Sequence, residues 1–298
     1  MDKLRSFMKK YPLVYALLGF ALLWTAIRIL PKIPAGALTI GVNEIKAGLF
    51  VLLVYWLLSG RSRDLKPDFT GFSYGFRLVR YFYILLFVLA AVGIAAAVSA
   101  LVKGEGTESI LGNLFNSILI CLAVGVVEEF TCRAMLFGGL VRLFRGTRKG
   151  VIWAAVISAF VFGFVHVANE VFTGQISDTA GVMQVIGKTV EAGLFGFVLA
   201  VVYFKTRSIW SVVAMHSLFD FLALIASLTG GGLSSYVKTD SVSGRAASIA
   251  YLVLSLLELP AVIRAWRELG KEPEPYVCPG DEDFTPRSLV YTKEKKNK

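Results

Sequence analysis

The chain of 298 residues is 56% hydrophobic and only 17% charged, and its mean hydropathy is +0.66. Soluble domains carry about a quarter of charged residues, so this composition excludes a soluble globular protein and indicates an integral membrane protein. The net charge of +10 does not indicate nucleic-acid binding, because Lys and Arg lie between apolar runs and not together in one polar region.

Long apolar runs recur along the chain and predict an all-α, polytopic membrane bundle of about eight transmembrane helices. The first run is too long for a secretory signal and lacks a small-residue cleavage site, so we expect it to be retained. Residues 61–80 are polar and aromatic and predict a connector on the membrane surface. The predicted spans are residues 11–30, 37–58, 81–102, 110–144, 151–172, 181–204, 209–228 and 246–266.

These spans make residues 1–270 a single membrane-embedded helical domain. Residues 271–298 are rich in Pro, acids and lysines and predict a polar, disordered cytoplasmic tail. Positive residues precede the first span and follow the second, fourth and sixth. The positive-inside rule then predicts a multi-pass protein with both termini in the cytoplasm.

The three cysteines do not indicate a disulfide framework. Cys121 and Cys132 lie on one predicted helix, and a separation of eleven residues corresponds to about 16 Å, too far for a bridge. Cys278 lies in the tail. We expect all three to be reduced.

One apolar segment, residues 124–136, carries three ionisable side chains within six positions: Glu128, Glu129 and Arg133. Each such group at the centre of a membrane helix costs roughly 2.5–3.5 kcal/mol on insertion scales, so the three together indicate a function. The i, i+4 spacing lets Glu129 and Arg133 neutralise each other on one helix face. Glu128 is rotated by roughly 100° and lacks that partner.

Both histidines of the chain also lie in predicted spans. His166 follows Phe162 by one turn, and His216 precedes Asp220 by one turn on the same face. Each could be an interhelical hydrogen-bonding residue, but together with the acidic pair they favour a functional site. Lys188 and Glu191 are a competing intramembrane pair, which we interpret as structural.

A carboxylate and an imidazole on either side of a water molecule are typical of a general-base hydrolase, and a second imidazole can donate to the oxyanion that forms. Two imidazoles and two carboxylates also suit zinc, so Glu128, His166, His216 and Asp220 form an alternative metal set. The helical zinc signature HExxH is missing, which weakens the support for a zinc site without excluding it. A transporter, a proton relay or an immunity scaffold would use the same polar cluster without any catalysis.

Three ordered motifs resemble those of the CAAX protease and bacteriocin-processing family, which includes the type II CAAX prenyl endopeptidases. They are EExxxR at residues 128–133, FxxxH at 162–166, and HxxxD at 216–220, where the prenyl-processing members have HxxxN. The resemblance covers about residues 110–228. It implies an intramembrane endopeptidase whose site opens to the cytoplasm and whose substrate is a membrane-associated peptide or protein, prenylated or a peptide precursor.

Carried over by position, Glu128 activates water with the help of His166. Glu129 and Arg133 form the ion pair that orients Glu128, and His216 with residue 220 binds the oxyanion. An ionised Asp220 cannot donate a hydrogen bond, which leaves three alternatives: Asp220 is protonated, it orients His216, or it favours a metal. The expected partners are the substrate and the lipid bilayer, with no nucleic acid, and no cofactor is expected unless zinc is bound.

Overall fold

The computed structural model describes residues 1–28, 39–103, 107–144, 147–176, 178–225 and 242–271. Within these ranges the chain forms helices and no strands, so the all-α prediction is confirmed. The predicted tail and the end of the seventh predicted span lie outside the described residues.

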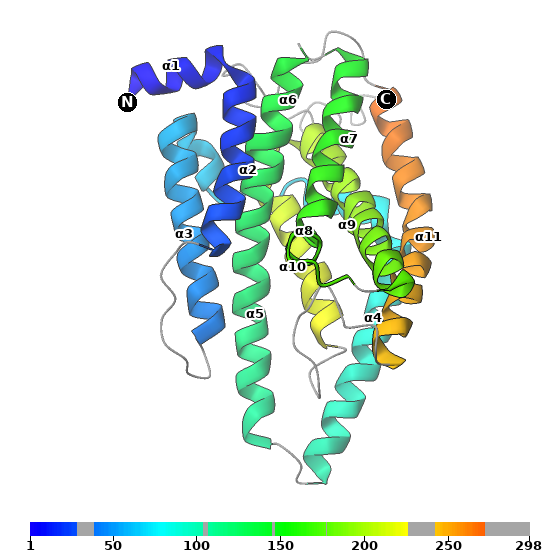
Figure 1. Ribbon diagram of the computed structural model, residues 1–298. Helices are drawn as coiled ribbons and strands as arrows, with labels where there is room; N and C mark the ends of the chain where they lie inside the picture. Colours follow the sequence, from blue (N-terminus) through cyan, green and yellow to red (C-terminus); the bar gives the residue numbers. More distant parts are fainter. Residues whose placement is uncertain (29–38, 104–106, 145–146, 177, 226–241, 272–298) are drawn as a thin grey trace, which may run out of the picture.

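Eleven α-helices, one 3₁₀ turn and one π-helical segment make up the described part of the bundle (Figure 1). In chain order they are α1 (Asp2–Lys10), α2 (Pro12–Arg28), α3 (Thr39–Ser59), η1 (Ser62–Leu65), α4 (Phe72–Val102), α5 (Thr107–Glu129), the π-helical η2 (Phe130–Phe137), α6 (Gly138–Leu143), α7 (Arg148–Val165), α8 (Ala168–Phe172), α9 (Thr179–Thr206), α10 (Ile209–Ile225) and α11 (Val242–Gly270).

Five described helical stretches are long and apolar enough to cross a membrane, and α4 makes a sixth if its two parts, bent by 78°, form one span. Two shorter apolar helices, Pro12–Leu23 and Ile209–Leu224, accompany them. The chain is therefore a polytopic membrane bundle, but the predicted count of eight spans is not confirmed.

One predicted span is not continuous. The span predicted at residues 151–172 is divided, because the backbone leaves the helix at Val167 and the short α8 follows. His166 consequently caps the C-terminal end of α7 instead of lying inside a continuous span. The predicted surface connector is partly helical, since α4 begins at Phe72, and its predicted end at residue 80 coincides with the bend between the two parts of α4.

The central stretch runs without interruption from α5 through η2 into α6, as its predicted length suggested. The eight residues of η2 are all buried, and a π-helix has hydrogen bonds between residues five positions apart instead of four. The Ser158 hydroxyl from α7 donates to the Cys132 carbonyl at 3.2 Å, which ties α7 to η2. Such π segments in helices are frequent at functional sites.

Glycines allow the helices around η2 to approach closely. A Cβ at Gly163 of α7 would meet the Thr189 carbonyl and would lie 3.0 Å from the Gly193 nitrogen on α9. A Cβ at Gly125 of α5 would meet the Ser217 hydroxyl on α10. These crossings hold α5, α7, α9 and α10 at backbone contact distance, which interhelical packing in membranes favours.

Basic side chains gather at one end of the bundle, which we call the basic end. There α1 lies across the bundle, and both the N-terminus and the last described residues are at the same end (Figure 1). Arg148 at the start of α7 donates to the Gly270 carbonyl at the end of α11, which joins these two helix ends. Within the described chain, Cys121 and Cys132 are buried free thiols, as expected.

The crossing of α7 and α9 gives a stability prediction. Gly163→Ala should lower the free energy of unfolding by about 1–3 kcal/mol, because the new methyl group has no room against α9. Gly112→Ala is the matched control, since a Cβ there meets no atom within 4 Å and the substitution favours the helix by about 0.5–1 kcal/mol. Thermal unfolding of both variants in detergent measures the difference, and equal melting temperatures would contradict the packing argument.

Candidate active site

The three sequence motifs come from different helices and meet in one cluster. Glu128 lies at the end of α5, His166 at the end of α7, and His216 and Asp220 on α10. The Glu128 Oε2 atom is 4.0 Å from His166 Nε2 and 3.6 Å from His216 Nε2. His216 Nε2 is in turn 3.4 Å from Asp220 Oδ2. All six residues singled out from the sequence are therefore in or directly beside this cluster.

A buried chain of charged groups supports the cluster from behind. Arg133 Nε lies 3.1 Å from Glu129 Oε2, which is the pair that the helical spacing predicts. The other carboxylate oxygen, Oε1, lies 2.6 Å from His216 Nδ1. Arg133 and Glu129 are 0% exposed and His216 is 3% exposed, so the three groups must satisfy one another.

The contact between Glu129 and His216 was not predicted. The sequence interpretation connected Glu129 only with Arg133 and Glu128, its neighbours on the same helix. No local pattern relates residues 87 positions apart, so the link depends on how α10 packs against α5. A carboxylate that holds one ring nitrogen of a histidine fixes the ring orientation and places the proton on that nitrogen.

The tautomer of His166 follows from a similar argument. His166 Nδ1 lies 2.8 Å from the Phe162 carbonyl oxygen, which can only accept a hydrogen bond. Nδ1 therefore carries a proton, and in the neutral ring Nε2 offers its lone pair toward Glu128. This hydrogen bond is available because His166 terminates α7 and still lies one turn after Phe162.

Aromatic rings enclose both imidazoles. Phe162 meets His166 and His216 edge to face, with centroids 4.8 and 5.6 Å apart, and Phe195 meets His216 at 5.9 Å. The Arg133 guanidinium lies 4.0 Å from the centre of the Phe162 ring, and its two terminal nitrogens have no hydrogen-bond acceptor among the described residues. The face of Phe162 thus compensates part of that buried charge.

Several supporting residues were missed from the sequence. Tyr83 of α4 donates to the Met215 carbonyl at 2.5 Å and thereby holds the turn of α10 that carries His216. A Cβ at Gly196 of α9 would lie 2.8 Å from the Phe162 ring and 3.1 Å from Arg133, so a glycine makes room for both. Neither residue has a charge or a motif that marks it, and only the packing reveals it.

Exposure separates the cluster into two groups. The side chains of Glu128, His166 and Asp220 are 13%, 19% and 25% exposed, whereas those of Glu129, Arg133 and His216 are almost inaccessible. The side chains of Glu128 and His166 are therefore partly exposed, although the Glu128 Oε2 atom itself is buried without a hydrogen-bond partner among the described residues.

The competing pair is present on α9. Lys188 Nζ is 2.8 Å from Glu191 Oε2, one turn along α9, and the lysine also lies over the Tyr251 ring of α11 at 5.1 Å. The pair lies where α9 contacts α11, and its structural role stays a prediction.

For the zinc alternative, the described residues contain no group of three or more His, Cys, Asp or Glu side chains arranged to hold a metal ion. The nearest polar atoms of Glu128 and His216 are 3.6 Å apart, and two ligands of one metal ion can have this separation. The zinc assignment stays a prediction, and the donor set alone does not decide it.

Comparison with known proteins identifies the region that carries this cluster. Residues 110–222 match the family model described as "Type II CAAX prenyl endopeptidase Rce1-like", and this range contains all six residues of the cluster. No curated protein and no solved structure matches the chain. The match covers less than half of the chain, and within it the chain is similar to the type II CAAX prenyl endopeptidases.

Proposed function

We propose that the chain is an intramembrane endopeptidase that hydrolyses a peptide bond of a membrane-associated substrate, with Glu128 as the general base. The observation that carries the proposal is the convergence of Glu128, His166 and His216 from three helices, with the side chains of the first two partly exposed. An Rce1-like domain over the same residues supports the same reaction class.

A water molecule fits between Glu128 and His166. Two acceptor atoms 4.0 Å apart can each lie about 2.8 Å from one water oxygen, which then donates one hydrogen to Glu128 Oε2 and the other to His166 Nε2. Glu128 removes one proton as the water oxygen attacks the scissile carbonyl carbon. The same proton then passes to the departing amide nitrogen, so the carboxylate is regenerated when the peptide bond breaks.

The oxyanion that forms in this step needs a hydrogen-bond donor. His216 keeps a proton on Nδ1 through Glu129, so a second proton on Nε2 would face the reacting centre. Asp220 Oδ2, 3.4 Å from Nε2, is placed to orient that imidazole, which favours the orienting role among the three alternatives.

The substrate class and the membrane orientation belong to the same proposal. The family description names prenylated CAAX substrates, and we propose a membrane-associated peptide or protein, prenylated or a peptide precursor, as the partner here. The positive-inside rule supports an orientation in which both termini and the entrance of the site face the cytoplasm.

Glu128→Gln and His166→Ala should each reduce cleavage by about 10²–10⁴-fold, because each removes one of the two groups that bind the water. Glu258→Gln is the matched control, since Glu258 is also a buried carboxyl on a membrane helix, only 2% exposed, but lies on α11 outside the cluster. The measurement is cleavage of a farnesylated CAAX peptide by purified protein in proteoliposomes, with comparison of membrane proteomes to find native substrates.

Unchanged cleavage by both variants would exclude this mechanism. Ion or solute flux that is lost with Glu128→Gln, in the absence of any peptide cleavage, would favour the transporter alternative.

Asp220 gives a separate prediction. Asp220→Asn should keep cleavage within about tenfold, because the amide oxygen still accepts from His216 and its NH₂ group can donate to the oxyanion. Asp220→Leu should lower kcat by at least about 100-fold with little change in KM, because leucine can neither accept a hydrogen bond from His216 nor donate one to the oxyanion. Equal loss with Asn and Leu would instead require an ionised carboxylate at this position.

The glutamate mechanism and the metal mechanism differ in whether cleavage persists after metal ions are removed. With Glu128 as the base, cleavage should persist after dialysis against a chelator when elemental analysis finds no zinc in the protein. Stoichiometric zinc that disappears in His216→Ala, together with activity restored by added zinc, would replace the glutamate mechanism with a metal mechanism.

A further inference from the structure

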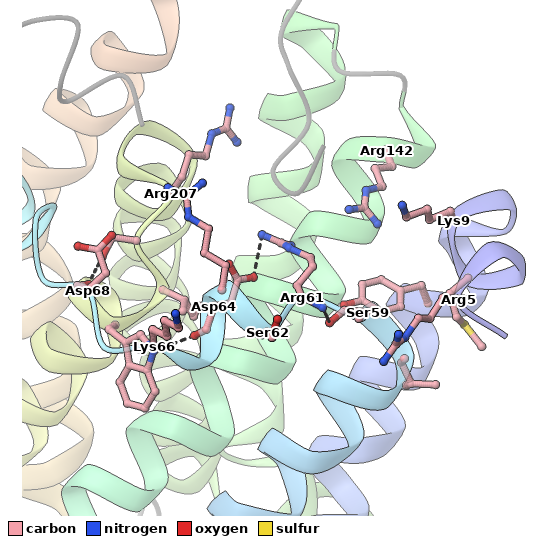
Figure 2. Close-up of a pocket in the computed structure, with 18 residues that line it drawn as sticks. Arg5, Lys9, Ser59, Arg61, Ser62, Asp64, Lys66, Asp68, Arg142 and Arg207 are labelled. Atoms are coloured by element: carbon pink, nitrogen blue, oxygen red, sulfur yellow. Dashed lines mark hydrogen bonds and ion pairs between the residues drawn. The ribbon is translucent and has the colours of Figure 1, made fainter. Parts of the chain in front are cut away.

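A second site lies at the basic end of the bundle, apart from the Glu128 cluster. A pocket of about 470 Å³ opens where α1, the end of α3 with η1, the end of α6 and the corner between α9 and α10 meet (Figure 2). Its volume is within the usual range of ligand pockets, about 300–1,000 Å³. None of the six residues of the Glu128 cluster lines it.

The lining of this pocket is strongly basic. Seven cationic and two acidic side chains surround it, a formal charge of +5. Figure 2 shows the charged ends of Lys9 and Arg142 turned toward each other, while the Arg61 guanidinium is paired with Asp64. The cationic residues are Arg5, Lys9, Arg61, Arg63, Lys66, Arg142 and Arg207, and the acidic residues are Asp64 and Asp68.

Both acidic residues of the lining already form hydrogen bonds or ion pairs within the protein. The Asp64 carboxylate accepts from the Tyr55 hydroxyl and lies 2.8 Å from Arg61. Asp68 accepts from the backbone nitrogen of Thr70 at 3.0 Å. Outside the lining, Asp2 lies 3.9 Å from Arg5, and the lining itself keeps its formal charge of +5. The pocket therefore presents a concentrated positive potential that an anion would complement.

The arginines are held in place by neighbouring groups of the protein. Arg142 lies over the Tyr15 ring at 5.9 Å, and Arg207 over the Phe204 ring at 4.3 Å. Arg207 also adopts a left-handed backbone conformation (φ 58°), unfavourable for a residue other than glycine, where it terminates α9. Strain retained at a residue that lines a charged pocket is typical of a functional site.

We propose that this pocket binds a phosphate-bearing anion, and the position favours the headgroup of an anionic phospholipid as its source. Arginine forks match phosphate oxygens, and basic pockets at the ends of membrane helices are typical headgroup sites. Met8, Leu58 and Trp210 provide an apolar part of the lining, where a glycerol backbone would lie. Beside the pocket, α1 exposes Leu4 and Phe7 by 43% and 45%, as an interfacial helix does.

The test measures binding to the purified full chain in neutral detergent. The probes are dioctanoyl phosphatidylglycerol, dioctanoyl phosphatidylcholine and inorganic phosphate, and the readouts are Kd by native mass spectrometry and the shift in melting temperature. The pocket variant is Lys9→Gln with Arg142→Gln. The control is Lys149→Gln with Arg267→Gln, which removes the same charge from two exposed residues near the joined ends of α7 and α11, outside the pocket.

Phosphatidylglycerol should bind more tightly than phosphatidylcholine, and the pocket variant should weaken it by at least about tenfold, the effect of losing one to two charge-assisted hydrogen bonds. The control should change Kd by less than about twofold. Melting temperatures without lipid show that both variants fold. Equally tight binding of inorganic phosphate would assign the site to free phosphate and still support an anion site.

Equal Kd values for wild type and the pocket variant, or equal losses in the pocket and control variants, would overturn the proposal. So would anion binding that appears only after Asp281→Asn, Glu282→Gln and Asp283→Asn, since the acidic tail would then be the occupant. These outcomes concern binding alone, so they do not depend on the proposed peptidase activity.

Discussion

The interaction on which the rest of the site depends is the buried chain from Arg133 through Glu129 to His216. These groups lie among membrane helices with almost no exposure, so each needs the others to compensate for the loss of water. The chain joins η2 to α10, and the ring of Phe162 brings α7 into the same arrangement. Removal of one member would leave an uncompensated buried charge, which typically costs about 3–5 kcal/mol.

Two adjacent glutamates consequently do different things. The rotation between consecutive helical residues turns Glu129 toward the buried chain and Glu128 toward the accessible side of the cluster. Irregular backbone lies beside both sides of the site, because η2 begins directly after Glu129 and α7 ends at His166. Regular helices on either side keep these irregular turns in position. The Glu128 carboxylate and the His166 imidazole therefore face each other at a distance too long for a direct hydrogen bond.

The basic pocket and the Glu128 cluster are connected by packed aromatic side chains. Trp210, which lines the pocket, donates to the Asp64 carbonyl at 2.8 Å and meets Phe130 edge to face at 5.7 Å. Phe130 is the residue after Glu129 and is fully buried. A ligand that orders the pocket would therefore contact the same aromatic group that packs behind the charged chain.

The amino-acid sequence by itself determined the class of fold, the approximate spans and the residues of the cluster, because apolar run length and charges inside apolar runs are local properties. It also determined the Glu129–Arg133 pair, since both lie on one helix. Only the tertiary structure decided that Glu129 also holds His216, that α7 ends at His166, and that Tyr83 and Gly196 support the site. Those features depend on how helices far apart in the chain pack together. The basic pocket likewise contains cations from four separate segments, and no local pattern brings them to one place.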